Sequence, residues 1–295
     1  MHISIATGSI AAIPLIQNLA TSSLLTQLII PEPHNELEGI YSQFVEPGLI
    51  VKTTQNEATN LNDIIDTDIL ISIGYPYRIG ALEQSTKGLN VHFGALPENR
   101  GPDPVFWTLR KGKKIAYISV HKLSEKFDEG DILIQKGHPI MPGENYGLLY
   151  AKLGTLLVPM IKDLLTGGLK GTPQDVANAQ YLNKPKEEEI KIDWNEPARQ
   201  VENLINACNP KYNGAFTSMN GAMLRIFEAV PVQDFQTNDL SSFNPGQIIN
   251  VSNEGVFVLC GHDSVICLRV VSLNEGIFSG AKLGALGLNQ NITFE

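Results

Sequence analysis

Ile69-Leu70-Ile71-Ser72-Ile73 is an apolar run whose side chains fall on both sides of an extended backbone. A strand that is apolar on both faces is typical of a parallel sheet covered by helices, and it is unusual in an antiparallel sheet with one solvated face. Similar β-rich runs precede and follow it, at residues 2–6, 24–30, 49–52, 115–121 and 132–136. The pattern therefore predicts a buried, mainly parallel sheet.

Segments with helical spacing alternate with these runs. Residues 12–20 place Ile13, Ile16 and Leu19 on one side, and residues 145–165 carry a longer apolar stripe. The stripe comprises Leu148, Leu149, Leu153, Leu156, Leu157 and Ile161. Pro159 lies inside this second segment and is expected to kink it. Strands that alternate with helices predict an α/β fold with right-handed crossovers.

The rest of the chain changes character. Residues 166–210 contain breaker residues, a charged run and a helical segment at 198–208 that Asn209-Pro210 ends, so we expect a linker with one helix. Residues 211–295 contain closely spaced β-rich runs separated by turn residues. These runs lie at residues 222–227, 247–251, 256–260 and 265–271. Such spacing predicts a small β-barrel or sandwich.

Length and composition bound the class of protein. The 295 residues include 43% hydrophobic side chains, which is enough for a core and excludes wholesale disorder. Apolar runs stay below the ~18 residues of a membrane span, and the N-terminus lacks the pattern of a signal peptide. The three cysteines fit a reducing, cytoplasmic setting. The net charge of −9 argues against a general nucleic-acid binder.

Residues 88–101 carry the side chains best suited to chemistry. Asn90 and His92 lie two positions apart, so on a strand both point to the same face. Leu96-Pro97 and Arg100-Gly101 then force an irregular loop. Open α/β sheets bind ligands where such loops follow the carboxyl ends of strands, so we expect a site here.

A second string, at residues 127–133, supplies a carboxylate. Asp128 lies in a glycine-containing turn just before a predicted strand, and Asp131 is expected to be a turn residue outside the chemistry. If Asp128 meets Asn90 and His92 in one cleft, an amide, an imidazole and a carboxylate come together. Such a set is suited to acid–base chemistry and to oxyanion stabilisation.

The two strings together form a known pattern. N-x-H-x-x-x-L-P-x-x-R-G at residues 90–101, followed by D-x-G-D-I-L at residues 128–133, resembles the folate-dependent formyltransferases. The match is best to the methionyl-tRNA formyltransferase-like group, which includes sugar-amine N-formyltransferases. The resemblance implies a Rossmann-like catalytic domain at residues 1–165, a linker and connecting helix at 166–210, and an OB-like C-terminal β-barrel at 211–295.

The resemblance also implies a cofactor and a set of roles. The formyl donor would be 10-formyltetrahydrofolate, and no metal is implied. Asn90 and a protonated His92 would donate hydrogen bonds to the oxyanion that develops when an amine attacks the formyl carbon. Asp128 would keep His92 charged and help to relay the amine's proton. The positions that match the family's folate-binding residues are Tyr77, Arg78, Ile79, Leu96 and Pro97.

Departures from the family pattern bear on the acceptor. Members that act on tRNA carry a long basic loop soon after the second strand, but here residues 31–38 are short and acidic and would repel phosphate. We therefore expect a small-molecule or carrier-bound amine, such as an amino sugar or an aminoacyl group. Two alternatives stay open, a methionyl-tRNA formyltransferase and a formyltetrahydrofolate hydrolase. Gly94 replaces the family's usual serine, so one hydroxyl near the site is missing.

Four further residues need interpretation. His121 ends a predicted strand and either lines the cleft or is a structural histidine. Arg100 either binds an anionic group of the substrate or supports its own loop. Cys260 and Cys267 flank a turn and are expected to be core residues rather than metal ligands. The sequence does not determine the oligomeric state, and we expect no membrane partner.

Overall fold

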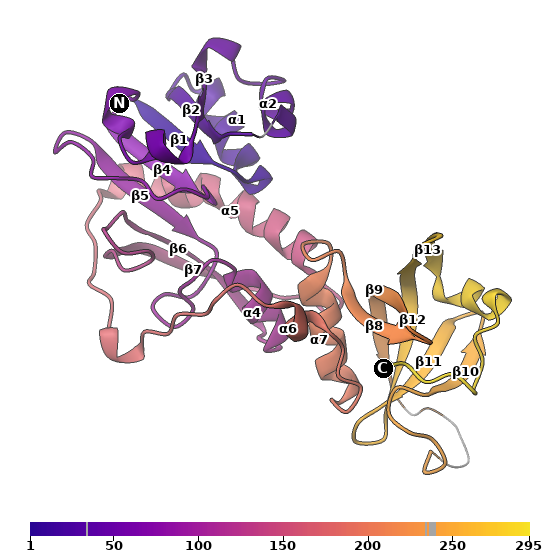
Figure 1. The fold of residues 1–295 in the computed structure, drawn as a ribbon. Helices are drawn as coiled ribbons and strands as arrows, with labels where there is room; N and C mark the ends of the chain where they lie inside the picture. Colours follow the sequence, from indigo (N-terminus) through magenta and orange to yellow (C-terminus); the bar gives the residue numbers. More distant parts are fainter. Residues whose placement is uncertain (34, 234, 236–239) are drawn as a thin grey trace. The chain divides into compact units, whose positions relative to one another are not determined.

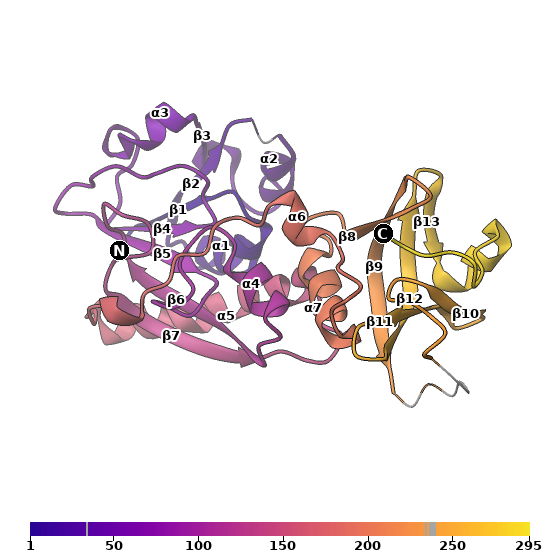
Figure 2. The ribbon, with the colours of Figure 1, turned by 60° about the horizontal axis from the view of Figure 1, so that its bottom comes forward.

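The computed structural model describes residues 1–33, 35–233, 235 and 240–295. The chain forms two compact units, each assembled from separate stretches of sequence (Figure 1, Figure 2). The first unit comprises Met1–Pro104, Ile115–Pro139 and Tyr150–Leu182, and the second comprises Val105–Lys114, Ile140–Leu149 and Asn183–Glu295. The domain boundaries expected near residues 165 and 210 stay a prediction.

The first unit is built on a seven-stranded sheet with the order β3-β2-β1-β4-β5-β6-β7. Its strands are β1 Ile3–Thr7, β2 Leu25–Pro31, β3 Ile50–Thr53, β4 Ile69–Ile73, β5 Lys87–His92, β6 Ile115–Lys122 and β7 Ile132–Pro139. Strands β1 to β5 pair in parallel, whereas β5–β6 and β6–β7 pair antiparallel. All of β4 is buried, as its apolar pattern predicts. The mainly parallel α/β sheet is confirmed, with an antiparallel edge.

Helices pack on this sheet and complete its core. They are α1 Ile13–Thr21, α2 Asn35–Tyr41, α3 Gln55–Ala58 and most of α5 Tyr146–Gly167, with 3-10 turns η1 Ile10–Ala12, η2 Pro47–Leu49, η3 Leu61–Asp63 and η4 Val176–Asn178. The stripe predicted on α5 is wrong at Leu148, which is 56% exposed. Leu148 shares a helix face with Lys152 and Thr155, which are exposed as well. Within the described ranges, no helix is both long and apolar enough to cross a membrane.

The second unit contains an antiparallel sheet. Its strands are β8 Ala215–Met219, β9 Ala222–Val232, β10 Ile248–Ser252, β11 Gly255–Cys260, β12 Ser264–Leu273 and β13 Gly276–Ser279, and its helices are α4 Pro104–Arg110, α6 Glu187–Ile190, α7 Ala198–Cys208 and η5 Gly280–Leu286. The sheet order is β10-β11-β12-β9-β8, and β13 pairs with β12. Among the described strands, β10 and β8 do not pair with each other, so the predicted closed OB-like barrel is not confirmed.

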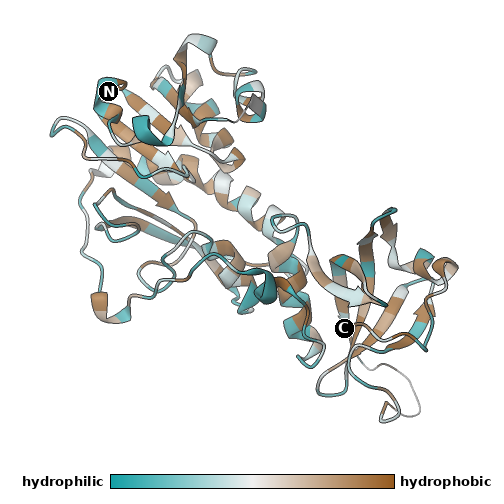
Figure 3. Cartoon of the chain, viewed as in Figure 1, coloured by the Kyte–Doolittle hydropathy of each residue, from teal (hydrophilic) through white to brown (hydrophobic). Residues whose placement is uncertain are grey.

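Hydrophobic residues concentrate on the strands and on α5, whereas the connecting loops are largely hydrophilic (Figure 3). In the second unit, Phe257, Leu259, Val265 and Cys267 belong to one buried cluster. Cys260 and Cys267 are free thiols buried in this sheet, as expected of core residues. Burial raises the pKa of the Cys260 thiol to about 12, so this side chain is unreactive at neutral pH.

Candidate active site

Strand β5 carries two of the three predicted catalytic side chains. Asn90 pairs with His121 of the antiparallel strand β6. Leu89 and Val91 are buried on one face of β5, and alternation directs Asn90 and His92 to the other. Asn90 is half-buried, whereas His92 is only 6% exposed. Asn90 is therefore the more accessible of the two side chains.

The Asn90 side chain is held by His121. Nδ2 of Asn90 lies 3.0 Å from Nε2 of His121, and Nδ1 of His121 lies 2.8 Å from the carbonyl oxygen of Lys122. Since a carbonyl accepts and never donates, Nδ1 carries the ring hydrogen and Nε2 accepts one amide hydrogen of Asn90. This leaves the second amide hydrogen of Asn90 for another acceptor. A proton on Nε2 would instead favour Oδ1 of Asp128, which lies 3.6 Å away.

His92 lies between two oxygen acceptors. Its Nε2 is 2.7 Å from the carbonyl oxygen of Asn99, and its Nδ1 is 3.3 Å from Oδ1 of Asp128. An imidazolium donates to both oxygens at once, whereas a neutral ring donates to one of them. A ligand oxygen reaches the Nε2 hydrogen by sharing it with the Asn99 carbonyl or by displacing that carbonyl. The structure brings His92 and Asp128 together, and their catalytic roles stay predictions.

Asp128 is buried in its charged form. Its Oδ2 accepts a hydrogen bond of 2.9 Å from the amide of Gly101. Its backbone is left-handed, with φ of 60°, and Gly101 has φ of 114°, a conformation that favours glycine. Burial raises the pKa of Asp128, but His92 and the Gly101 amide favour the carboxylate more strongly, whereas His121 would add to this only with a proton on Nε2. The pKa therefore lies well below its usual range, and Asp128 supplies a negative charge beside His92.

Gly94 makes room for the loop that closes over His92. A Cβ atom at this position would lie 2.6 Å from Cβ of Pro104, 2.8 Å from Nε2 of His92 and 3.0 Å from the carbonyl oxygen of Asn99. A larger residue would therefore separate His92 from Asn99 unless the loop moved. The loop occupies the space that the hydroxyl of a serine would need.

Three of the predicted folate-binding residues follow β4. The hydroxyl of Tyr77 donates to the carbonyl of Glu32 at 2.5 Å, and Nη2 of Arg78 donates to the carbonyl of Glu125 at 2.9 Å. Ile79 packs against a buried cluster of the first unit. These contacts fix the loop at the carboxyl end of β4, and the role of the three residues toward folate stays a prediction.

The other two predicted folate-binding residues follow β5. Leu96 is buried, and a cis peptide bond joins it to Pro97. Nε2 of Gln135 donates to the carbonyl of Leu96 at 3.0 Å, and the amide of Gln180 donates to the carbonyl of Pro97 at 3.1 Å. The loop is thus held by hydrogen bonds from two other segments. Its contact with folate also stays a prediction.

Arg100 and Gln174 form a polar contact beside the site. Arg100 is 7% exposed, and its guanidinium donates to Oε1 of Gln174 and, at 3.1 Å, to Oε1 of Glu129. These partners favour a supporting role for Arg100. Gln174 was not among the predicted site residues, because it lies in the expected linker and belongs to no motif or periodic pattern.

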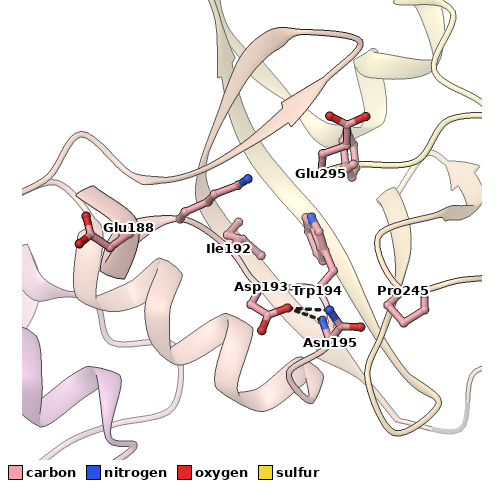
Figure 4. A pocket seen from close by; sticks show the side chains of 9 residues that line it. Glu188, Ile192, Asp193, Trp194, Asn195, Pro245 and Glu295 are labelled. Carbon is pink, nitrogen blue, oxygen red and sulfur yellow. Dashed lines mark hydrogen bonds between the residues drawn. The ribbon is translucent and has the colours of Figure 1, made fainter. Parts of the chain in front are cut away.

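The second unit contains a pocket of about 320 Å³ (Figure 4). Trp194 lines it and stacks on Phe294 with ring centroids 5.6 Å apart. Asp193 accepts two hydrogen bonds from Asn195, which Figure 4 shows as dashed lines. The pocket contains none of the predicted catalytic residues.

Comparison with known proteins decides the family. Residues 56–158 match the family described as formyl transferase, and residues 184–282 match its C-terminal domain. The chain belongs to the formyltransferase family. A methionyl-tRNA formyltransferase from Streptococcus pneumoniae (strain Hungary19A-6) is 30% identical over 181 residues, which cover 60% of this chain and 56% of that protein. The matched region thus spans little more than half of this curated formyltransferase.

Two solved structures share the fold of this chain. HypX from Aquifex aeolicus, in complex with tetrahydrofolic acid, has a TM-score of 0.65 and 19% identity, covering 96% of this chain and 46% of HypX. An N-formyltransferase from Helicobacter canadensis, in complex with folinic acid and dTDP-3-aminofucose, has a TM-score of 0.62 and 16% identity, covering 91% and 99% of the two chains. At these identities the likeness concerns the fold.

Proposed function

We propose that this formyltransferase moves a formyl group from 10-formyltetrahydrofolate to a primary amine on a small-molecule or carrier-bound acceptor. One observation carries the proposal. Asn90 presents an amide hydrogen on the same face of β5 as His92, whose ring contacts the buried carboxylate of Asp128. Acyl transfer to an amine requires a hydrogen-bond donor for the developing oxyanion beside a charged imidazole–carboxylate pair, and this site contains both.

The donor set fits the proposed cofactor. When bound, 10-formyltetrahydrofolate supplies a formyl carbon that is open to attack by an amine. The face of β5 that carries Asn90 offers hydrogen-bond donors to a carbonyl oxygen, and the loops after β4 and β5 lie at the carboxyl ends of neighbouring strands. In open α/β sheets this edge is where ligands bind. We therefore place the cofactor along Tyr77, Arg78, Ile79, Leu96 and Pro97.

The side chains act on the charge that develops during transfer. Asn90 donates its second amide hydrogen to the formyl oxygen as the acceptor nitrogen bonds to the formyl carbon. His92 donates to the same oxygen when its Nε2 turns from Asn99, and Asp128 balances the charge of the ring. The carboxylate of Asp128 accepts from the Gly101 amide and lies 3.3 Å from Nδ1 of His92, so it stabilises the charge of the ring. For the transfer to balance, the bond between the formyl carbon and the cofactor nitrogen would break, and that nitrogen would take up the proton that the amine loses.

A small or carrier-bound amine is the favoured acceptor. Helix α2 begins with the acidic residues Glu36 and Glu38, and Lys52 is paired to Glu38 at 2.6 Å. This acidic stretch, of which His34 lies outside the described residues, would repel the phosphates of tRNA. The structure from Helicobacter canadensis contains a nucleotide-linked amino sugar, which is an acceptor of the expected chemical class.

A second candidate acceptor is aminoacylated initiator tRNA. The observation that favours it is the 30% identity to a methionyl-tRNA formyltransferase. Binding of tRNA would weaken steeply with added salt, because phosphate contacts release counterions. A small-molecule acceptor would show a much weaker dependence on salt.

The proposal is tested by offering the purified chain 10-formyltetrahydrofolate with a panel of acceptors. The panel contains nucleotide-linked amino sugars, free and carrier-bound amino acids, and charged initiator tRNA. We expect an acceptor other than tRNA to gain the mass of one CO. The control is Asn56→Ala, an exposed asparagine of α3 whose loss should leave transfer unchanged.

Each other outcome excludes part of the proposal. Transfer to tRNA alone would overturn the acceptor class and leave formyl transfer standing. Release of formate without any acceptor would identify a formyltetrahydrofolate hydrolase. A chain that neither modifies an acceptor nor releases formate would refute the proposed activity as a whole.

A further inference from the structure

A segment of the expected linker lies against both loops of the candidate site. Thr172 and Ile132 exchange two backbone hydrogen bonds of 2.9 Å, at the start of β7. Eight to ten residues later, the chain runs beside the loop after β5. There the amide of Arg100 donates to the carbonyl of Gln180 at 3.0 Å, and the amide of Leu182 donates to the carbonyl of Arg100 at 2.9 Å. Residues 172–182 therefore connect the segment that carries Asp128 with the segment that carries Arg100 and Gly101.

Both the nitrogen and the oxygen of the Gln174 side-chain amide form hydrogen bonds that link these two segments. Its Nε2 donates to the carbonyl oxygens of Asp128 and Gly130, at 2.7 and 2.8 Å. Its Oε1 accepts from Nε and Nη2 of Arg100, at 3.1 and 2.8 Å. Two donors and two acceptor sites are all that a glutamine amide has, so its hydrogen-bonding capacity is filled.

These bonds surround the contact that orients the catalytic carboxylate. Gln174 holds the backbone of Asp128 on one side and the side chain of Arg100 on the other. The residue after Arg100 is Gly101, whose amide donates to Oδ2 of Asp128 at 2.9 Å. Gln174, Asp128, Gly101 and Arg100 thus form a closed ring in which each member fixes the next.

The backbone of Asp128 needs such support. A left-handed conformation with φ of 60° costs free energy for a residue with a side chain, and it persists where the surroundings hold it. The two hydrogen bonds from Gln174 hold the carbonyl oxygens of Asp128 and Gly130 on both sides of this turn. Because Asp128 is 8% exposed, water is not well placed to substitute for them.

We infer that Gln174 is a positioning residue, which fixes the left-handed turn at Asp128 and thereby directs its carboxylate toward His92. The inference rests on the proposed function and deepens it, because it adds a residue from the linker to the machinery of transfer. The contacts of Gln174 are with Arg100 and with the backbone of Asp128 and Gly130, so it would act through Asp128.

Two variants separate the bonds to the carbonyls from the bonds to Arg100. Gln174→Met keeps the length of the side chain and removes all four hydrogen bonds. Gln174→Glu keeps the acceptor for Arg100 and, as a carboxylate, has no hydrogen to donate to Asp128 and Gly130. Gln17→Met, at an exposed position of α1, is the matched control.

The first readout is hydrogen exchange at the Gly101 amide, measured by NMR in the folded chain, and it does not depend on activity. Both Gln174 variants should exchange this amide at least about tenfold faster, since loss of the turn weakens its bond to Asp128. The second readout is formyl transfer, for which kcat should fall on the order of 10²-fold with little change in KM, the effect of a misplaced catalytic group.

The outcomes distinguish the inference from the proposed function. Gly101 exchange at the wild-type rate in Gln174→Met would overturn the inference whether or not the chain transfers formyl groups. Wild-type kcat in Gln174→Glu would show that Gln174 serves Arg100 alone and would also overturn it. A wild-type chain with no transfer activity would refute the proposed function, and the exchange rates would still decide the role of Gln174.

Discussion

Nε2 of His121 accepts a hydrogen bond from Nδ2 of Asn90 across strands β5 and β6, at 3.0 Å. His121 is fixed in turn by the carbonyl of Lys122, which binds the opposite ring nitrogen. The imidazole therefore determines which way the Asn90 amide faces, and it leaves one amide hydrogen for a ligand. Of the two interpretations that the sequence allows for His121, this arrangement favours a role at the site.

Replacing His121 tests that relationship. In His121→Phe, Asn90 loses its acceptor and its amide is free to turn, so kcat should fall by about one order of magnitude or more, since one oxyanion donor is worth about 10²–10³. His121→Gln retains an acceptor and should lose less. The measurement is steady-state formyl transfer by both variants, and equal rates in the phenylalanine variant and wild type would refute the role of His121.

Removing the Asn90 amide should lower kcat more than replacing His121 does. Asn90→Ala should fold normally, because Asn90 is half-buried at the end of a strand, and should lose about 10²–10³ in kcat. The loss should appear in kcat rather than in KM, because the bond strengthens as charge develops on the formyl oxygen. A change confined to KM would instead assign Asn90 to binding.

The depressed pKa of Asp128 has a consequence for stability. Its folded pKa lies below the unfolded value, so ionised Asp128 stabilises the fold fully above the unfolded pKa of about 3.9. That contribution declines as the pH falls from there toward the folded pKa. Urea denaturation of wild type and Asp128→Asn should therefore show a stability difference that is constant near neutrality and shrinks below about pH 4. A difference that grows on acidification would contradict the assignment.

Gly94 should tolerate no side chain. In Gly94→Ala the new methyl group would meet Pro104 and Nε2 of His92 at less than 3 Å, so we expect a loss of about 1–3 kcal/mol in unfolding free energy and lower kcat. Gly39→Ala in α2 is the control, because among the described residues no atom beyond its chain neighbours and its own helix backbone lies within 4 Å of the new Cβ. That substitution should be neutral or stabilising by about 0.5–1 kcal/mol. Equal thermal stability of the two variants would contradict this packing.

The features that could be predicted from the sequence are those that depend on a local pattern of residues. The apolar run at Ile69–Ile73 predicted the buried strand β4, and the two-residue spacing of Asn90 and His92 predicted their common face. Arrangements that depend on pairing between distant segments were not accessible in this way. The antiparallel partner of β5 brings His121 opposite Asn90, and no local pattern specifies that register.

The same limit applies to the linker and to the second unit. Gln174 forms its four hydrogen bonds because residues 172–182 return along the sheet. The chemical nature of a glutamine in the sequence does not indicate that path of the chain. Closure of a barrel depends on whether the first and last strands pair, and the turn residues that predicted the strands carry no information about that pairing.

A double-mutant cycle on formyl transfer tests most directly whether Asn90 and Asp128 act as one unit. Asn90→Ala, Asp128→Asn and the double variant are compared with wild type under saturating 10-formyltetrahydrofolate and acceptor, after circular dichroism has shown that each is folded. The account predicts that the double variant is scarcely slower than the slower single variant, because groups that act together are non-additive. Losses that multiply, or a single variant with wild-type kcat, would contradict it.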